Sequence, residues 1–242
     1  MQLRPYQQQQ DFELRKGISL GAIIQMLMSP TGSGKTEVAK HIIAGAQAKN
    51  RRAWFIVDSV KLLDQTLERF HKDGLVAGAI QSDHPCTDYR KPIQVATIQS
   101  LRPRLDYMLN HHKPHLVLID EAHVIHEAHI ELITWCRRNK VPVIGLSATP
   151  WRRGLGRIFD RLVNCISLSE LTDQGFLVPT QCYAPSVPSL KGVSTKPNGD
   201  WIEDELATVM GDAKLLGDVV THWKELGENR KTMVFACNVQ HS

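Results

Sequence analysis

Residues 29–36 read Ser29-Pro30-Thr31-Gly32-Ser33-Gly34-Lys35-Thr36 and stand between an apolar run and an amphipathic stretch. Gly32 and Gly34 let the backbone curl so that successive N–H groups face an anion, and a helix opening near Lys35 adds its dipole. Lys35 is expected to reach the terminal phosphates of a nucleoside triphosphate, and the Thr36 hydroxyl to ligate Mg²⁺. Ser29 stands where the strict pattern has its first glycine. The strand before and the helix after nevertheless favour a nucleotide site over a chance glycine-rich turn.

Short apolar runs alternate with longer amphipathic stretches around this loop, which is typical of strand–helix–strand units in a parallel sheet. The runs at 116–119 and 141–144 lack polar alternation, as expected of strands covered on both faces. We therefore predict an α/β fold, a parallel sheet with helices on both faces. The expected strands are residues 23–28, 53–57, 78–80, 93–97, 115–120 and 141–146, and the expected helices are residues 5–15, 36–49, 60–71, 99–111 and 122–139.

An acidic pair, Asp120-Glu121, follows the fifth expected strand within the sequence Asp-Glu-Ala-His. Ligands of open α/β sheets gather at the carboxyl ends of the strands, and the phosphate loop leaves a strand at the same edge. Asp120 is predicted to hold Mg²⁺ with Thr36, and Glu121 to orient and deprotonate the attacking water. A helix N-terminus favours acids in any case, but the phosphate loop favours a catalytic set of Lys35, Asp120 and Glu121.

Histidines recur at positions 123, 126 and 129. The sequence His126-Glu127-Ala128-His129 is one residue short of the spacing of the HExxH zinc motif, and no cysteine stands beside it at ligand spacing. We expect no zinc site here and interpret His126 and His129 as helix-surface residues.

The composition indicates an ordinary globular protein, with 242 residues, 42% hydrophobic and 22% charged. No stretch has the length and apolarity of a membrane helix, and the start lacks a signal-peptide core. The five cysteines form no CxxC pair, which favours reduced thiols and a cytoplasmic location. The net charge of +4 is compatible with a polyanionic partner but does not identify one.

The composition changes after Pro179, and we expect the first domain to end at residue 182. Residues 183–200 contain several prolines and glycines with few large apolar residues, so they are expected to form a linker. Residues 201–226 are expected to be helical with a break near Gly211, and residues 232–237 to form a buried strand. One helix and one strand cannot complete a domain. Residues 201–242 are therefore expected to be the truncated beginning of a second domain.

With the phosphate loop and the sequence Asp-Glu-Ala-His in this order, the chain resembles superfamily 2 helicases and translocases. It is most similar to DEAD/DEAH-box and restriction-enzyme-subunit ATPases. The resemblance covers most of residues 3–182 and resumes at 201–242. It implies that the first domain has the RecA-like fold of P-loop NTPases and that residues 201–242 begin a second RecA-like domain. Residues 174–179 resemble the exit from the first motor domain.

The resemblance also implies roles for residues outside the phosphate loop. The segment Leu3-Arg4-Pro5-Tyr6-Gln7 resembles the adenine-reading segment of the family, which implies ATP binding by Arg4 and Gln7, because an amide can both donate to and accept from adenine. The segment at 146–150 resembles the motif that couples hydrolysis to movement. It implies hydrogen bonds from the hydroxyls of Ser147 and Thr149 to the 120–123 segment, with His123 as a partner. Within the loop, the predicted ATP-binding residues are Thr31, Gly32, Ser33, Gly34, Lys35 and Thr36.

Residues 57–65 and 95–101 resemble the strand-contacting motifs of the family. They imply contacts from Lys61, Thr97 and Gln99 to a polynucleotide backbone. DNA is favoured over RNA by the resemblance of segments 62–65 and 147–152 to DNA translocases. Two alternatives stay open at this point. Thr97 and Gln99 could simply cap the helix that follows them, and Lys61 could be a solvated helix residue.

We therefore expect an ATP- and Mg²⁺-dependent motor domain of a nucleic-acid-dependent ATPase. We expect it to be poorly active alone, because the family completes its ATP site with arginines of a second motor domain. The alternative is a nucleotide-gated binding module that acts without a second motor domain or with a partner chain. A P-loop kinase for a small molecule would leave the segments at 120–123 and 146–150 unexplained.

Overall fold

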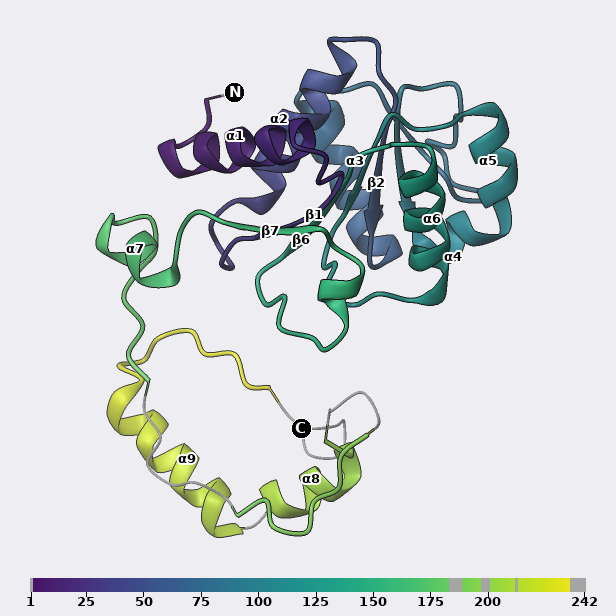
Figure 1. Ribbon diagram of the computed structural model, residues 1–242. Helices are drawn as coiled ribbons and strands as arrows, with labels where there is room; N and C mark the ends of the chain where they lie inside the picture. The colour runs from purple at the N-terminus through teal and green to yellow at the C-terminus, as the bar shows by residue number, and fades with distance from the viewer. Residues whose placement is uncertain (1, 183–188, 197–200, 212, 236–242) are drawn as a thin grey trace. The chain divides into compact units, whose positions relative to one another are not determined.

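The computed structural model describes residues 2–182, 189–196, 201–211 and 213–235. Contacts within the chain divide it into two compact units, Met1–Pro179 and Thr180–Ser242. Figure 1 shows the sheet of the first unit between its flanking helices. The predicted boundary, at residue 182, lies three residues beyond this division.

The first unit is built on a seven-stranded sheet with the order β3-β4-β2-β5-β6-β1-β7. Every pairing in this sheet is parallel, which confirms the predicted fold class. The strands are β1 Ile24–Met28, β2 Ala53–Val57, β3 Ala77–Ala79, β4 Ile93–Thr97, β5 Leu116–Ile119, β6 Val143–Ser147 and β7 Arg161–Asn164.

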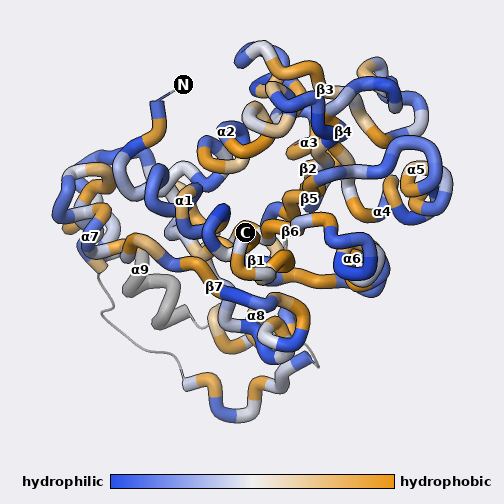
Figure 2. Tube along the Cα trace, turned by 45° about the horizontal axis from the view of Figure 1, so that its top comes forward, coloured by the Kyte–Doolittle hydropathy of each residue, from blue (hydrophilic) through white to orange (hydrophobic). Residues whose placement is uncertain are grey.

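Two hydrophobic clusters cover the two faces of the sheet, because successive side chains of a strand point to opposite faces. In β2, Phe55 and Val57 belong to the cluster formed with helices α1, α2 and α3, while Trp54 and Ile56 belong to the cluster formed with α4, α5 and α6. Figure 2 shows the hydrophobic colouring along the central strands and hydrophilic segments on the outer turns of α6. The helices are α1 Pro5–Ser19, α2 Lys35–Gln47, α3 Val60–Lys72, α4 Ile98–Leu101, α5 Leu105–His111, α6 Glu127–Arg138 and α7 Leu168–Asp173.

Several features of the first unit differ from the prediction; helix α7, for example, was not predicted. The expected helix at 99–111 is interrupted by a 3₁₀ turn, Arg102–Arg104, which contains Pro103; proline cannot donate its backbone N–H. The expected helix at 122–139 begins only at Glu127, because the chain first turns at Glu121, whose φ is +46°. The edge strand β7 was not predicted, because it is only four residues long and its apolar pair Leu162-Val163 lies between polar residues, with Val163 alone buried.

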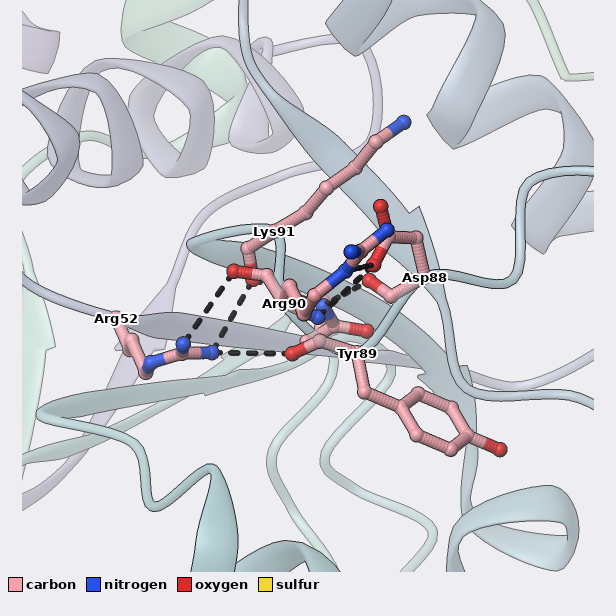
Figure 3. Close-up of polar contacts among 6 residues, drawn as sticks. Arg52, Asp88, Tyr89, Arg90 and Lys91 are labelled. Carbon is pink, nitrogen blue, oxygen red and sulfur yellow. Dashed lines mark hydrogen bonds and ion pairs between the residues drawn. The ribbon is translucent and has the colours of Figure 1, made fainter.

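The segment before β4 is fastened to the sheet by one arginine (Figure 3). The guanidinium of Arg52 donates to the carbonyls of Tyr89 at 3.1 Å, Arg90 at 3.3 Å and Lys91 at 3.4 Å. The same segment lies along the edge strand β3, where the N–H of Ala79 donates to the carbonyl of Cys86 at 2.9 Å. Arg52 therefore helps to cover a sheet edge that would otherwise be open.

The second unit contains α8 Glu203–Met210 and α9 Ala213–Leu226, which agree with the predicted helical stretch and its break near Gly211. The predicted strand at 232–237 is wrong for its described part. Residues 232–235 carry no strand, and Phe235 is 88% exposed. A strand needs a neighbour to pair with, and the described residues of this unit offer only an isolated bridge between Thr195 and Trp201. Residues 236 and 237 lie outside the described part, as do 183–188 and 197–200 of the predicted linker.

None of the helices in the described ranges is both long enough and apolar enough to cross a bilayer.

Candidate active site

The phosphate loop connects β1 to α2, at the carboxyl edge of the sheet. Gly32 and Gly34 both have φ of +80°, in the left-handed region that side chains avoid. A Cβ added to Gly34 would lie 2.7 Å from Nε2 of Gln7, and one added to Gly32 would lie 2.7 Å from a methyl carbon of Leu177. The backbone conformation therefore favours glycine at both positions, and a larger residue would also displace the ends of these two side chains.

The side chains of the loop divide into those that face the protein and those that face outward. Ser33 is buried, whereas Thr31 and Gly32 are exposed and Thr36 is half-buried. The ammonium of Lys35 donates to the carbonyl of Ser29 at 3.2 Å. Lys35 therefore lies folded back along the loop, beside the backbone amides that the sequence predicts will face phosphate.

Asp120 and Glu121 lie at the same edge, one strand away from the loop. β6 separates β5 from β1, and the last residue of β6, Ser147, accepts at its carbonyl from the N–H of Ser29 at 3.0 Å. Burial raises the pKa of the Asp120 carboxyl, and the charge of Glu121 adds to this effect while that of Lys35 opposes it. A nearby cation would offset such a shift, so this carboxyl suits a metal ligand.

A short chain of polar contacts joins the acidic pair to β6. Nδ1 of His123 lies 3.1 Å from Oγ of Ser147 and 3.3 Å from Oε2 of Glu121. The N–H of Thr149 donates to the same Ser147 oxygen at 3.1 Å. The predicted link through Ser147 is thus present as a contact. Thr149 contributes its backbone, and its exposed hydroxyl forms no hydrogen bond within the described residues.

The N-terminal helix α1 lies directly against the loop. Nε2 of Gln7 donates to the carbonyl of Ser33 at 3.0 Å, and Oε1 of Gln7 accepts from the N–H of Arg4 at 2.9 Å. The hydroxyl of Tyr6 donates to the same Ser33 carbonyl at 2.7 Å. Gln7, predicted to read adenine, thus uses both of its amide atoms within the protein and contacts the loop through Ser33.

Three residues beside the loop were not predicted as site residues: Tyr6, Gln10 and Phe176. The guanidinium of Arg4 lies 4.5 Å over the ring of Phe176, which packs edge-on against Tyr6. Nε2 of Gln10 donates to Oγ of Ser29 at 2.9 Å. The available signal was helical spacing, because Tyr6, Gln10 and Leu14 fall on the buried face of α1, where a glutamine needs a polar partner.

The three residues predicted to contact nucleic acid lie at the same edge of the sheet but differ in their exposure to solvent. Lys61 is exposed in the first turn of α3, and Gln99 is exposed in α4. Thr97 is buried and caps α4, accepting from the N–H of Ser100 at 3.2 Å, so the capping alternative holds for its hydroxyl. Next to Gln99 lies a cavity of about 360 Å³, whose other lining residues are Ile98, Arg102, His126, Glu127 and Ala128.

The interpretation of His129 as a surface residue is wrong. His129 is 6% exposed, and burial lowers its pKa to about 4. Its Nδ1 accepts from the N–H of His126 at 3.1 Å, and the two rings stack. His129 belongs to the face of α6 that packs on the sheet, while His126 precedes the helix and is exposed.

Comparisons with known proteins give a consistent result. The family model of the type III restriction enzyme res subunit matches residues 1–152. A 51.5 kDa protein of a Lactococcus phage (isolate 7-9) is 27% identical over 221 residues, which are 90% of this chain and 44% of that protein. The chain thus spans less than half the length of this curated relative.

Two solved structures share the fold. The type ISP restriction-modification enzyme LlaGI, solved as a nuclease-deletion mutant with a DNA substrate mimic, has a TM-score of 0.58 at 18% identity, over 73% of this chain and 21% of that one. The UvsW helicase from bacteriophage T4 has a TM-score of 0.54 at 17% identity, over 67% and 60% of the two chains. The first unit therefore has the RecA-like fold of superfamily 2 helicase cores, and the chain belongs to the type III restriction enzyme res subunit family.

Proposed function

We propose that this chain binds ATP with Mg²⁺ and couples its hydrolysis to movement on, or remodelling of, a nucleic acid, DNA in preference to RNA. The observation that carries the proposal is the meeting of three segments at one sheet edge. These are the phosphate loop after β1, the acidic pair after β5, and Ser147 at the end of β6.

The residues at this edge fit a magnesium–nucleotide complex. The glycines of the loop let its backbone curl as an anion-binding loop requires, although the N–H of Ser33 donates to the carbonyl of Pro30 at 3.1 Å. The hydroxyl of Thr36 with the carboxylate of Asp120 would supply the oxygen ligands that Mg²⁺ prefers. Lys35 would bind the terminal phosphates. Mg²⁺, when bound, would neutralise the charge of the phosphates and polarise the bond that breaks.

Glu121 would orient the attacking water and accept its proton. Its Oε2 and Oγ of Ser147 both lie within reach of the same His123 nitrogen, at 3.3 and 3.1 Å. A single N–H at that atom can favour only one of the two acceptors. A change of charge at Glu121 during hydrolysis would therefore alter the His123–Ser147 contact and, through it, the segment that follows β6.

Polynucleotide contact is proposed for the exposed residues at the neighbouring strand ends, Lys61 after β2 and Gln99 after β4, with Thr97 holding the start of α4. Arg102, beside Gln99, adds a cation to the lining of the adjacent cavity. The DNA-bound state of LlaGI supports DNA as the partner. That residues 201–242 begin a second motor domain is part of this proposal.

The test is ATP turnover with and without single-stranded DNA and RNA, together with the salt dependence of oligonucleotide binding. Lys61→Ala is expected to reduce the magnitude of the slope of log affinity against log salt by about 0.7 and to lower affinity about threefold to tenfold. Lys49→Ala is the matched control, since Lys49 is exposed just beyond α2, at the opposite end of that helix from the loop. Nucleotide binding without turnover under any condition would instead favour a nucleotide-gated binding module.

A further inference from the structure

At the first position of the phosphate loop, side chains form hydrogen bonds that the strict motif cannot form, because that motif has a glycine there. Ser29 occupies this position and is fully buried. Its Oγ lies 2.6 Å from Oγ of Ser33 and accepts from Nε2 of Gln10 at 2.9 Å. Gln10 is itself fully buried, and Ser33 is 1% exposed. Three buried polar side chains thus form one chain from α1 into the loop.

The amide nitrogen of Gln10 can only donate, so the Ser29 hydroxyl accepts from it. The hydrogen bond between the hydroxyls of Ser29 and Ser33 can run in either direction. The backbone of Ser29 is also occupied, its N–H by the carbonyl of Ser147 and its carbonyl by Lys35. Ser29 therefore connects α1, β6 and the lysine of the loop at a single residue.

Helix α1 is connected by hydrogen bonds to two different groups of Ser33. Its carbonyl accepts from Tyr6 and Gln7, and its hydroxyl is reached from Gln10 through Ser29. Helix α1 therefore restrains Ser33 at both its carbonyl and its hydroxyl.

We propose that Gln10, acting through Ser29, is a positioning residue that holds the phosphate loop in the conformation that receives the phosphates of the nucleotide. The proposal rests on the proposed function, because it deepens the same ATP site. In this protein, the hydroxyls of Ser29 and Ser33 and the amide of Gln10 restrain the start of the loop. The strict motif has a glycine at position 29 and therefore no side chain there.

The test compares Gln10→Leu, Ser29→Ala and the double variant, using calorimetric titration with ADP-Mg and thermal unfolding. Each single change is expected to raise the Kd about tenfold and to lower the Tm, because it leaves a buried partner unsatisfied. The double variant removes the Gln10–Ser29 contact from both sides, but it leaves the buried Ser33 hydroxyl without Ser29 as its partner. It is expected to recover part of the Tm but keep a Kd about tenfold above that of the wild type, no more than either single variant.

Gln9→Leu is the matched control, because Gln9 is the exposed neighbour on α1, and both its Kd and its Tm are expected to match the wild type. A Kd that returns to the wild-type value in the double variant would show a purely structural network and overturn the proposal. So would single effects that multiply to about a hundredfold, or single variants that bind as the wild type does. Failure of the wild type itself to bind ADP-Mg would overturn the proposed function and this inference together.

Discussion

Asp120 follows the last residue of β5, where burial raises the pKa of its carboxyl and the negative charge of Glu121 adds to the shift. A raised pKa means that the folded protein disfavours the carboxylate relative to the unfolded chain. The ionised form therefore destabilises the fold, and this effect appears as the pH rises through the pKa of the folded state. A buried charge of this kind is common at sites that bind or react.

Asp120→Asn is expected to stabilise the folded chain at pH 7 by on the order of 1 kcal/mol, because it removes the buried charge. The side-chain oxygen of asparagine can still accept from the N–H of Glu121, as Oδ1 of Asp120 does at 3.0 Å. The difference should shrink as the pH falls through the pKa of the Asp120 carboxyl, where the wild type becomes neutral. Mg²⁺-dependent nucleotide binding should be lost at the same time. Denaturant unfolding at several pH values checks this, and a less stable variant at pH 7 would contradict it.

At the scale of single residues, the sequence allowed the loop glycines, Lys35 and the acidic pair to be predicted as site residues, because each has a chemical requirement visible in its motif. The burial of His129 was missed, since three-residue spacing cannot tell which side of a helix faces the sheet. The contact of Gln10 with Ser29 depends on how α1 docks against the loop, which no local pattern specifies.

At the scale of elements, β2 and β4 have the predicted bounds. β2 is an unbroken apolar run, and β4 is buried throughout although it includes Gln94 and Thr97. The misplaced elements follow from longer-range causes. β7 is an edge strand, and its Arg161 pairs with Glu13 of α1 at 2.5 Å, a contact 148 residues apart in sequence. The late start of α6 follows from the turn at Glu121, which brings His123 to Ser147.

Arg52 lets the role of one connecting segment be tested. Arg52→Ala is expected to lower the free energy of unfolding by about 1–3 kcal/mol, because the carbonyls of Tyr89, Arg90 and Lys91 lose their shared donor. Amides of β3 and of residues 86–92 should exchange hydrogen faster, while α2 should be unaffected. Arg51→Ala, an exposed neighbour, should stay within about 0.5 kcal/mol of the wild type. Equal stability of the two variants would show that the hydrogen bonds of Arg52 to residues 89–91 contribute nothing to the free energy of unfolding.

At the scale of the whole molecule, the described site residues lie in the unit Met1–Pro179. Their meeting at one edge was predictable, because all carboxyl ends of a parallel sheet meet there. The unit Thr180–Ser242 was less predictable. An apolar sequence such as Met233-Val234-Phe235 predicts a buried strand only if partner strands exist, and here all three side chains are at least 77% exposed. Pairing is a property of the neighbours, which the local pattern does not contain.

The most direct test of the central claim measures ATP-Mg binding and ATP turnover by the whole chain beside Glu121→Gln and Lys35→Ala. The wild type is expected to bind ATP-Mg and to turn it over slowly. Glu121→Gln should keep the affinity and lose at least about a hundredfold in rate, because the general base is gone. Lys35→Ala should lose the affinity. Turnover by Glu121→Gln at the wild-type rate would contradict the claim that the acidic pair and the phosphate loop form one catalytic site.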